Sequence, residues 1–150
     1  MLAESGLTRP SQSDPGGSPF VFLVEDDPDT RELYAHYLAS QGVRVETASD
    51  GPSALRLIVS LIPDVIVMDL SLPRLHGWEV TRRLKADPRT SHIPVIACTG
   101  YVTGGPSEQG LEAGCDAYII KPCLPDALLL TIKQVLARRR PESTSELRGR

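Results

Sequence analysis

The chain contains five short segments in which apolar residues follow one another with little interruption. Unbroken runs rich in β-branched residues are typical of strands that are buried on both faces of a parallel sheet. The run VIVM at 65–68 is the clearest case, because it stops at Asp69 and is followed by prolines and a glycine that cannot continue a strand. We therefore predict strands over residues 20–24, 43–47, 65–68, 93–98 and 117–120.

Between these runs, apolar residues recur every three or four positions, which is the spacing of one face of an amphipathic helix. At the start of the first such segment, Asp27 precedes Pro28 and is placed to cap a helix. The expected inward-facing residues of the first two helices are Leu33, Tyr34, Tyr37 and Leu38, then Ala54, Leu55, Leu57 and Ile58. The spacing predicts helices over 28–40, 51–61, about 77–86, and 125–139.

A further segment at 103–114 shows a weaker helical pattern, because glycines and a proline interrupt it. We expect a short or mobile helix there. Five strands alternating with five helices predict an α/β fold, a doubly wound parallel sheet with helices on both faces.

The length and composition of the chain are those of a single soluble domain. The chain has 150 residues, of which 41% are hydrophobic and 23% charged. Residues 1–19 are rich in Ser, Gly and Pro and are expected to form a flexible lead, and residues 139–150 a disordered basic and polar tail, leaving a domain at 20–138. Residues 20–132 carry 9 basic and 15 acidic residues, so the domain has no general electrostatic footprint for nucleic acid.

The three cysteines, at 98, 115 and 123, have neither zinc-site spacing nor a CxxC motif, which favours reduced thiols in the cytoplasm. No apolar run approaches the ~18 residues of a membrane span. Residues 2–19 do not resemble an ordinary signal peptide. We therefore expect a soluble, cytoplasmic protein.

Chemistry-bearing residues follow four of the predicted strands. Parallel strands deliver their carboxyl ends to one edge of the sheet, so these residues should converge there. A lone Asp after a strand usually caps a turn, but here three acids gather, and like charges oppose ionisation unless a cation lies among them. An all-oxygen site suits Mg²⁺ better than zinc, and a nearby hydroxyl and ammonium suit a phosphoryl group. The converging residues are Glu25, Asp26, Asp69, Thr99 and Lys121.

This combination resembles the receiver domain of bacterial two-component response regulators over about residues 20–138. The resemblance is carried by VEDDP at 24–28, Asp69 with SLPRLHG after it, Thr99, and KP at 121–122. The separations of 30 residues from Asp69 to Thr99 and 22 from Thr99 to Lys121 also agree with that family. The resemblance implies a flavodoxin-like fold with strand order 2-1-3-4-5.

The resemblance also implies roles for individual residues. Asp69 would be the phosphoacceptor, whose carboxylate attacks the phosphorus of a phosphohistidine on a sensor kinase. Asp26 would bind Mg²⁺ directly and Glu25 through a water molecule, while Asp69 and the backbone carbonyl of Ser71 would complete the metal site. Asp27, although acidic, is expected to cap the helix instead.

Two further residues, Lys121 and Thr99, would contact the phosphoryl oxygens. Tyr118 falls where the family has an aromatic switch residue, and simple core filling is an equally good interpretation of it. The surface that would change on phosphorylation is formed by the fourth helix, the fifth strand and the last helix.

The expected partners are a sensor histidine kinase or histidine phosphotransfer protein and a downstream protein effector. Beyond residue 140 we see no room for a DNA-binding or enzymatic domain, so we expect a stand-alone receiver, a monomer or weak homodimer, that binds neither DNA nor membrane. It would be a phosphoacceptor rather than an enzyme. Two alternatives are an adaptor that functions without phosphorylation and an aspartyl phosphohydrolase. The hydrolase usually needs a second carboxylate two residues after its nucleophile, where this chain has Ser71.

Overall fold

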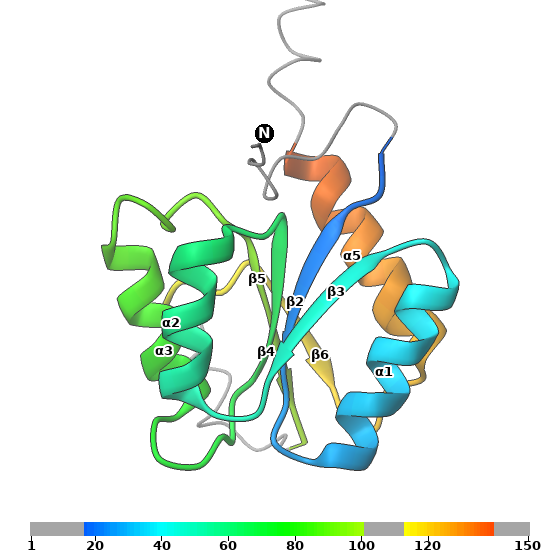
Figure 1. Ribbon diagram of the computed structural model, residues 1–150, viewed down its shortest axis with the longest axis horizontal. Helices are drawn as coiled ribbons and strands as arrows, with labels where there is room; N and C mark the ends of the chain where they lie inside the picture. Colours follow the sequence, from blue (N-terminus) through cyan, green and yellow to red (C-terminus); the bar gives the residue numbers. More distant parts are fainter. Residues whose placement is uncertain (1–16, 101–112, 140–150) are drawn as a thin grey trace, which may run out of the picture.

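The computed structural model describes residues 17–100 and 113–139, and shows a parallel five-stranded sheet between two layers of helices (Figure 1). The spatial order of the strands is β3-β2-β4-β5-β6, which is 2-1-3-4-5 in chain order and confirms the predicted topology. The strands are β2 (Phe20–Val24), β3 (Arg44–Ala48), β4 (Val65–Asp69), β5 (Val95–Thr99) and β6 (Ala117–Ile120).

The described part of the chain contains four helices, α1 (Pro28–Ser40), α2 (Gly51–Leu61), α3 (Gly77–Ala86) and α5 (Pro125–Arg139). The helix predicted over 103–114 lies almost entirely outside the described residues. The same holds for most of the predicted N-terminal lead and for the tail from residue 140. Among the residues described, no helix has both the length and the apolar character that a membrane crossing requires.

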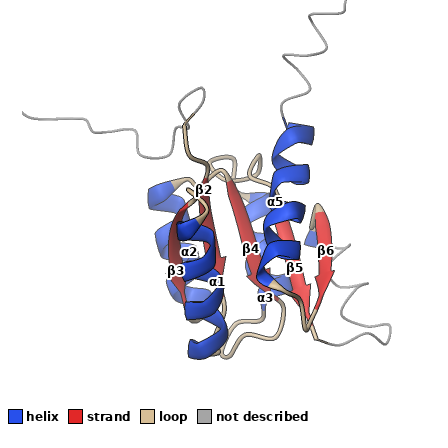
Figure 2. Cartoon of the chain, turned by 90° about the vertical axis from the view of Figure 1, so that its right-hand side faces the viewer, coloured by secondary structure: helices blue, strands red, loops and turns tan. Residues whose placement is uncertain are grey.

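The continuous apolar runs are explained by a sheet that is covered on both faces. Along β4, Val65 and Val67 pack with α1 and α5, whereas Ile66 and Met68 point to the other face and pack with α2 and α3. Figure 2 shows the strands side by side across the sheet, with α1 and α5 in front of them. Because successive side chains of a strand point to opposite faces, a doubly covered strand must be apolar at every position.

Two of the expected inward-facing leucines are exposed. Leu33 is 55% exposed and Leu57 is 37% exposed, although both lie among apolar neighbours in the sequence. The inward strip of α1 runs through Tyr34 and Leu38, four residues apart, and Leu33 lies about 100° around the helix from Tyr34. The helical spacing therefore predicted both helices correctly but made their buried faces too wide.

Side-chain caps fix where two of the helices begin. Asp27 accepts hydrogen bonds from the backbone N–H of Thr30 at 2.9 Å and from its hydroxyl at 2.6 Å, which confirms the predicted capping role. Asp50 caps α2 through the N–H of Ser53 at 2.8 Å and also pairs with Arg74 at 3.1 Å. The second contact ties α2 to the loop that follows β4.

The chain returns to the sheet at Gly77, the first residue of α3. Its N–H donates to the carbonyl of Leu70 at 3.2 Å, and a Cβ at this position would collide with the backbone carbonyl of Asp69 and lie 2.8 Å from the Cα of Leu70. Only a residue without a side chain fits against this backbone. The contact holds the loop at 70–76 against the end of β4.

We expect Gly77→Ala to lower the free energy of unfolding by about 2–3 kcal/mol, because the added methyl group overpacks a backbone contact that cannot yield. Urea unfolding would measure the change. Gly100→Ala is the matched control, since its Cβ would meet nothing closer than the Lys121 Cβ at 3.9 Å. Equal stability losses in the two variants would contradict this interpretation.

Candidate functional site

The predicted site residues gather at the carboxyl edge of the sheet. Asp69 ends the central strand β4, and Glu25 and Asp26 follow its neighbour β2. One carboxylate oxygen from each of these three residues lies within 4.8 Å of the other two. The structure therefore brings together the three acids that the sequence predicted to converge.

Two of the three carboxylates are withdrawn from solvent. Glu25 is 3% exposed and Asp69 is 4% exposed, whereas Asp26 lies on the surface. The parallel ladder continues past the strand ends, through hydrogen bonds from Glu25 N to Ala48 O at 3.1 Å and from Leu70 N to Cys98 O at 3.0 Å. The backbone that carries Glu25 and Asp69 is thus fixed by the sheet.

Lys121 places its ammonium group between the two buried acids. Its Nζ lies 2.6 Å from Glu25 Oε1 and 3.6 Å from Asp69 Oδ2. Its backbone N–H donates to the carbonyl of Thr99 at 2.8 Å, which holds the residue at the end of β6. Burial opposes the charge of Lys121, but the hydrogen bond that it donates to Glu25 and the charges of Asp69 and Glu25 raise its pKa above the ordinary value.

The carboxylate of Asp69 is held in a defined orientation. Its Oδ1 accepts a hydrogen bond from the backbone N–H of Ser71 at 3.0 Å, and its Oδ2 lies toward Lys121. Burial raises the pKa of Asp69 from 3.8 to about 6, and the charge of Glu25 and a hydrogen bond with Asp26 act in the same direction. The hydrogen bond from Ser71 and the charge of Lys121 oppose this increase.

Arg31 also supports the site, although the sequence interpretation gave it no role. One guanidinium nitrogen, Nη1, donates to the backbone carbonyl of Glu25 at 2.9 Å and lies 3.4 Å from that of Asp26. It therefore fixes the backbone that carries both acids. The available signal was an arginine one turn into the helix that follows an acidic loop.

Thr99 and Tyr118 lie on the two strands beyond β4. Thr99 ends β5 and is 3% exposed, one position past the residue that pairs with Asp69. Tyr118 pairs with Ala97 in the next strand and is half-buried against the core beneath α2 and α3. Burial raises the pKa of Tyr118. Thr99 is thus placed at the site edge, where its strand end predicted it, and Tyr118 lies behind that edge on the neighbouring strand.

The donor set fits a hard divalent cation. In the described ranges, the acidic cluster offers three carboxylates and neither imidazole nor thiolate, and oxygen-only ligands suit Mg²⁺ rather than zinc. The partly exposed position also allows such an ion to keep several water molecules. The residues that would hold it are Glu25, Asp26 and Asp69, with the backbone carbonyl of Ser71 as a further predicted ligand.

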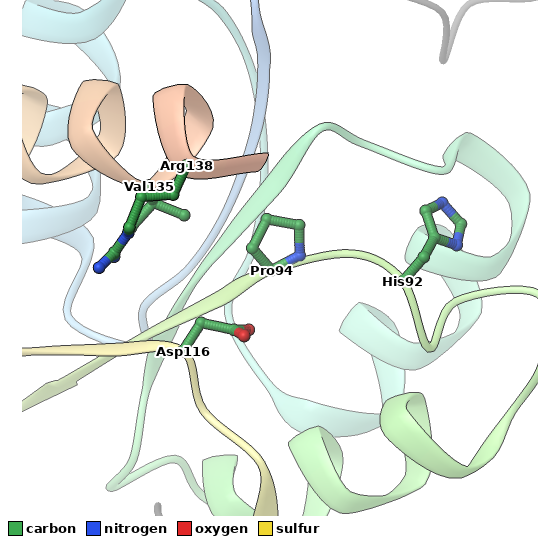
Figure 3. Close-up of a pocket in the computed structure, with 5 residues that line it drawn as sticks. All are labelled: His92, Pro94, Asp116, Val135 and Arg138. Atoms are coloured by element: carbon green, nitrogen blue, oxygen red, sulfur yellow. The ribbon is translucent and has the colours of Figure 1, made fainter. Parts of the chain in front are cut away.

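A hollow of about 220 Å³ lies at the opposite edge of the sheet, where the strands begin (Figure 3). Within it, Asp116 pairs with Lys85 at 3.1 Å and accepts a hydrogen bond from Val95 N at 2.8 Å. This carboxylate serves the structure of the sheet edge. The residues that line the hollow are His92, Pro94, Asp116, Val135 and Arg138, and none of them is a predicted site residue.

Comparison with known proteins agrees with this geometry. The model of the response regulator receiver domain matches residues 21–133. This chain belongs to that family. Receiver domains of two-component systems are signalling phosphoacceptors, and the members of this family typically bind Mg²⁺ in an acidic site.

Some relatives are much longer than the region that this chain matches, and others have nearly the same length as that region. The transcriptional regulatory protein AfsQ1 of Streptomyces coelicolor is 39% identical over 126 residues, covering 84% of this chain and 55% of the relative. The polar-differentiation response regulator DivK of Brucella anthropi is 38% identical over 116 residues, covering 77% of this chain and 94% of the relative. This receiver chain therefore spans about half the length of AfsQ1 but nearly all of DivK.

Solved receiver structures have the same fold. A CheY-like receiver domain from Methanospirillum hungatei has a TM-score of 0.79 and 28% identity, covering 84% of this chain and 99% of its own. The receiver domain of the sensor histidine kinase PA1611 from Pseudomonas aeruginosa has a TM-score of 0.71 and 32% identity, covering 81% of this chain and 97% of its own. That structure has a magnesium ion coordinated in the active site cleft.

Without divalent cations, we expect Asp69→Asn to increase the free energy of unfolding at pH 8. The pKa of Asp69 is about 6 in the folded chain and 3.8 as its ordinary value, so ionisation costs the folded state more than the unfolded state. This cost is complete above pH 6 and disappears as the pH falls through 4. The variant should therefore gain about 3 kcal/mol at pH 8 and progressively less on acidification.

Urea unfolding in the presence of EDTA at pH 8, 6 and 4.5 would measure this dependence. Glu46→Gln is a suitable control because Glu46 is exposed on the edge strand β3. A variant that is destabilised at pH 8, or a gain that does not change with pH, would contradict the expected linkage.

Proposed function

We propose that this domain accepts a phosphoryl group on Asp69, in a Mg²⁺-dependent reaction, from the phosphohistidine of a sensor kinase or a histidine phosphotransfer protein. The observation that supports this most strongly is the placement of one ammonium group, Lys121, among the buried carboxylates at the carboxyl edge of the sheet. Phosphoryl transfer needs mainly positioning and neutralisation of charge, and this edge offers both.

In the proposed reaction a carboxylate oxygen of Asp69 forms a bond to phosphorus as the phosphorus–nitrogen bond of phosphohistidine breaks. The electron pair of that bond stays with the leaving imidazole, which takes up a proton. The Ser71 N–H holds the other carboxylate oxygen and so orients the nucleophile. Lys121 and the hydroxyl of Thr99 then contact two oxygens of the new acyl phosphate.

A bound Mg²⁺ would neutralise the negative charge that the acids and the incoming phosphoryl group bring together. The proposed ligands are Asp26 and Asp69 directly, Glu25 through a water molecule, and the backbone carbonyl of Ser71. Arg31 contributes by holding the carbonyls of Glu25 and Asp26, and with them the direction of both carboxylates.

The proposed output is a change in a binding surface at β6 and α5. Three large apolar side chains are exposed there: Ile120 at 56%, Leu124 at 71% and Leu130 at 58%. Such residues support the assignment of a protein-binding face. In this proposal, Thr99 moves toward the phosphoryl group and Tyr118 turns inward, which changes the face presented to a downstream protein effector.

Incubation with Mg²⁺ and acetyl phosphate tests the proposal. We expect one phosphoryl group per chain, stable to acid and labile to base, that is absent in Asp69→Asn and retained in the control Asp29→Asn, an exposed aspartate in α1. Intact-mass measurement and release of acetate would report it. Continuous turnover would support an aspartyl phosphohydrolase instead, and absence of any reaction would support an adaptor that functions without phosphorylation.

We expect Lys121→Met to bind Mg²⁺ about three- to tenfold more tightly and to accept a phosphoryl group at least tenfold more slowly. The ammonium group pairs with the Glu25 carboxylate at 2.6 Å and so competes with the metal for this acid. It also stabilises the negative charge of the incoming phosphoryl oxygens. Calorimetric titration with Mg²⁺ would measure the first effect and acetyl phosphate kinetics the second.

Lys85→Met is the matched control for Lys121→Met, because Lys85 pairs with Asp116 at the opposite edge of the sheet. It should leave both quantities unchanged. Weaker Mg²⁺ binding in Lys121→Met would show that the lysine organises the acids rather than competing with the metal.

A further inference from the structure

Helix α2 has more apolar side chains than those that its contact with the sheet buries. Its sequence, GPSALRLIVSL, contains one charged residue, Arg56. Ala54 and Ile58 are buried against the sheet. Leu55 and Val59 are half-buried, with Leu55 packed against the edge of the core, and form a second apolar strip on the side of α2 that meets α3. Helices that are apolar around most of their circumference are normally covered on more than one side. The part of the second strip that stays exposed is available for a further contact.

The second strip lines a groove of about 470 Å³ between α2 and α3. These helices lie side by side on one face of the sheet, on the left in Figure 1, whereas α1 and α5 cover the opposite face. Four of the six lining residues are apolar and two are arginines: Pro52, Leu55, Val59 and Leu75, with Arg56 and Arg83.

The rim of the groove is basic, although the chain as a whole carries a net charge of −3. Arg56 is exposed, and its guanidinium group makes no hydrogen bond or ion pair with any residue that the structure describes. Arg83 is 56% exposed while it pairs with Glu79, and Arg74 in the adjoining loop is 68% exposed while it pairs with Asp50. These guanidinium groups leave donor positions directed to solvent, and α2 itself carries no acid to balance them.

We propose that the α2/α3 groove is a docking site for an acidic amphipathic helix of a partner protein. Apolar side chains of such a helix would occupy the strip formed by Leu55, Val59 and Leu75, in the helix-in-groove mode of recognition. Carboxylates on its flanks would pair with Arg56 and Arg83, which provides the charge complementarity that selects an acidic partner over a basic one. This surface is separate from both the phosphoryl site and the face at β6 and α5.

The test uses the full chain and a synthetic helical peptide with leucines on one face and glutamates elsewhere, together with a second peptide in which lysines replace the glutamates. Fluorescence anisotropy at low ionic strength would measure affinity, and amide chemical shifts would locate the contact. We expect the acidic peptide to bind at least tenfold more tightly than the basic one and to perturb residues of α2 and α3. Added salt should reduce this preference.

Arg56→Glu should weaken binding of the acidic peptide at least tenfold, and Val59→Gln should weaken binding of both peptides. The matched controls are Arg138→Glu, an exposed arginine of α5, and Leu57→Gln, an exposed leucine of α2 outside the groove. Both controls should retain the wild-type affinity. Circular dichroism melting would show that each variant is folded.

Three results would overturn the proposal. The first is equal binding of the two peptides, or chemical shift changes that map to the β6 and α5 face. The second is concentration-dependent self-association in sedimentation velocity that Arg56→Glu abolishes, which would make a second copy of the chain the occupant. The third is a change in the amide shifts of residues 1–16 on Val59→Gln without peptide, which would make the chain's own N-terminal segment the occupant.

Discussion

The ion pairs of Lys121 with Glu25 and Asp69 are the interaction on which this site depends. Two buried carboxylates at one sheet edge repel each other, and the ammonium at 2.6 and 3.6 Å provides the first compensating charge. One ammonium does not balance three acids. The remaining negative charge helps to keep the pKa of Asp69 near 6, and it is also what a divalent cation would relieve. The same imbalance thus costs stability and would favour the binding of such a cation.

The apolar core causes this imbalance. Asp69 ends a strand with neighbours on both sides, and every residue of β4 is buried. Packing of Ile66 and Met68 on one face, and of Val65 and Val67 on the other, excludes water up to the last residue of the strand. Burial is accordingly the largest cause of the raised pKa of Asp69. The hydrophobic pattern therefore positions the carboxylate and also desolvates it.

The amino-acid pattern predicted the strands, the residues at their carboxyl ends and the capping role of Asp27, because these follow from local periodicity and from the residue preferences of helix starts. The strand order did not follow from the pattern and was implied by the resemblance to receiver domains. The pattern could not predict that Lys121 lies closer to Glu25 than to Asp69, since that choice depends on side-chain geometry across 96 residues of sequence. Arg31 was overlooked for a related reason, as it acts on backbone carbonyls rather than on side chains. Leu57 was placed inward because α2 has few polar residues to mark its outer face.

That error in α2 has a physical meaning. A helix with one charged residue offers little contrast between its faces. Part of its excess apolar surface, Leu55 and Val59, lines a groove that also contains Leu75, while Leu57 lies outside that groove. Leu75 belongs to the loop that follows Asp69, and this loop packs closely against the start of α2. A Cβ added at Gly51 would lie only 2.6 Å from the carbonyl oxygen of Leu75. The pairing of Asp50 with Arg74 fixes the same loop from the other side. A partner in the groove would therefore press on the segment that holds the backbone of Asp69, and any resulting effect on binding at that site would have to be reciprocal.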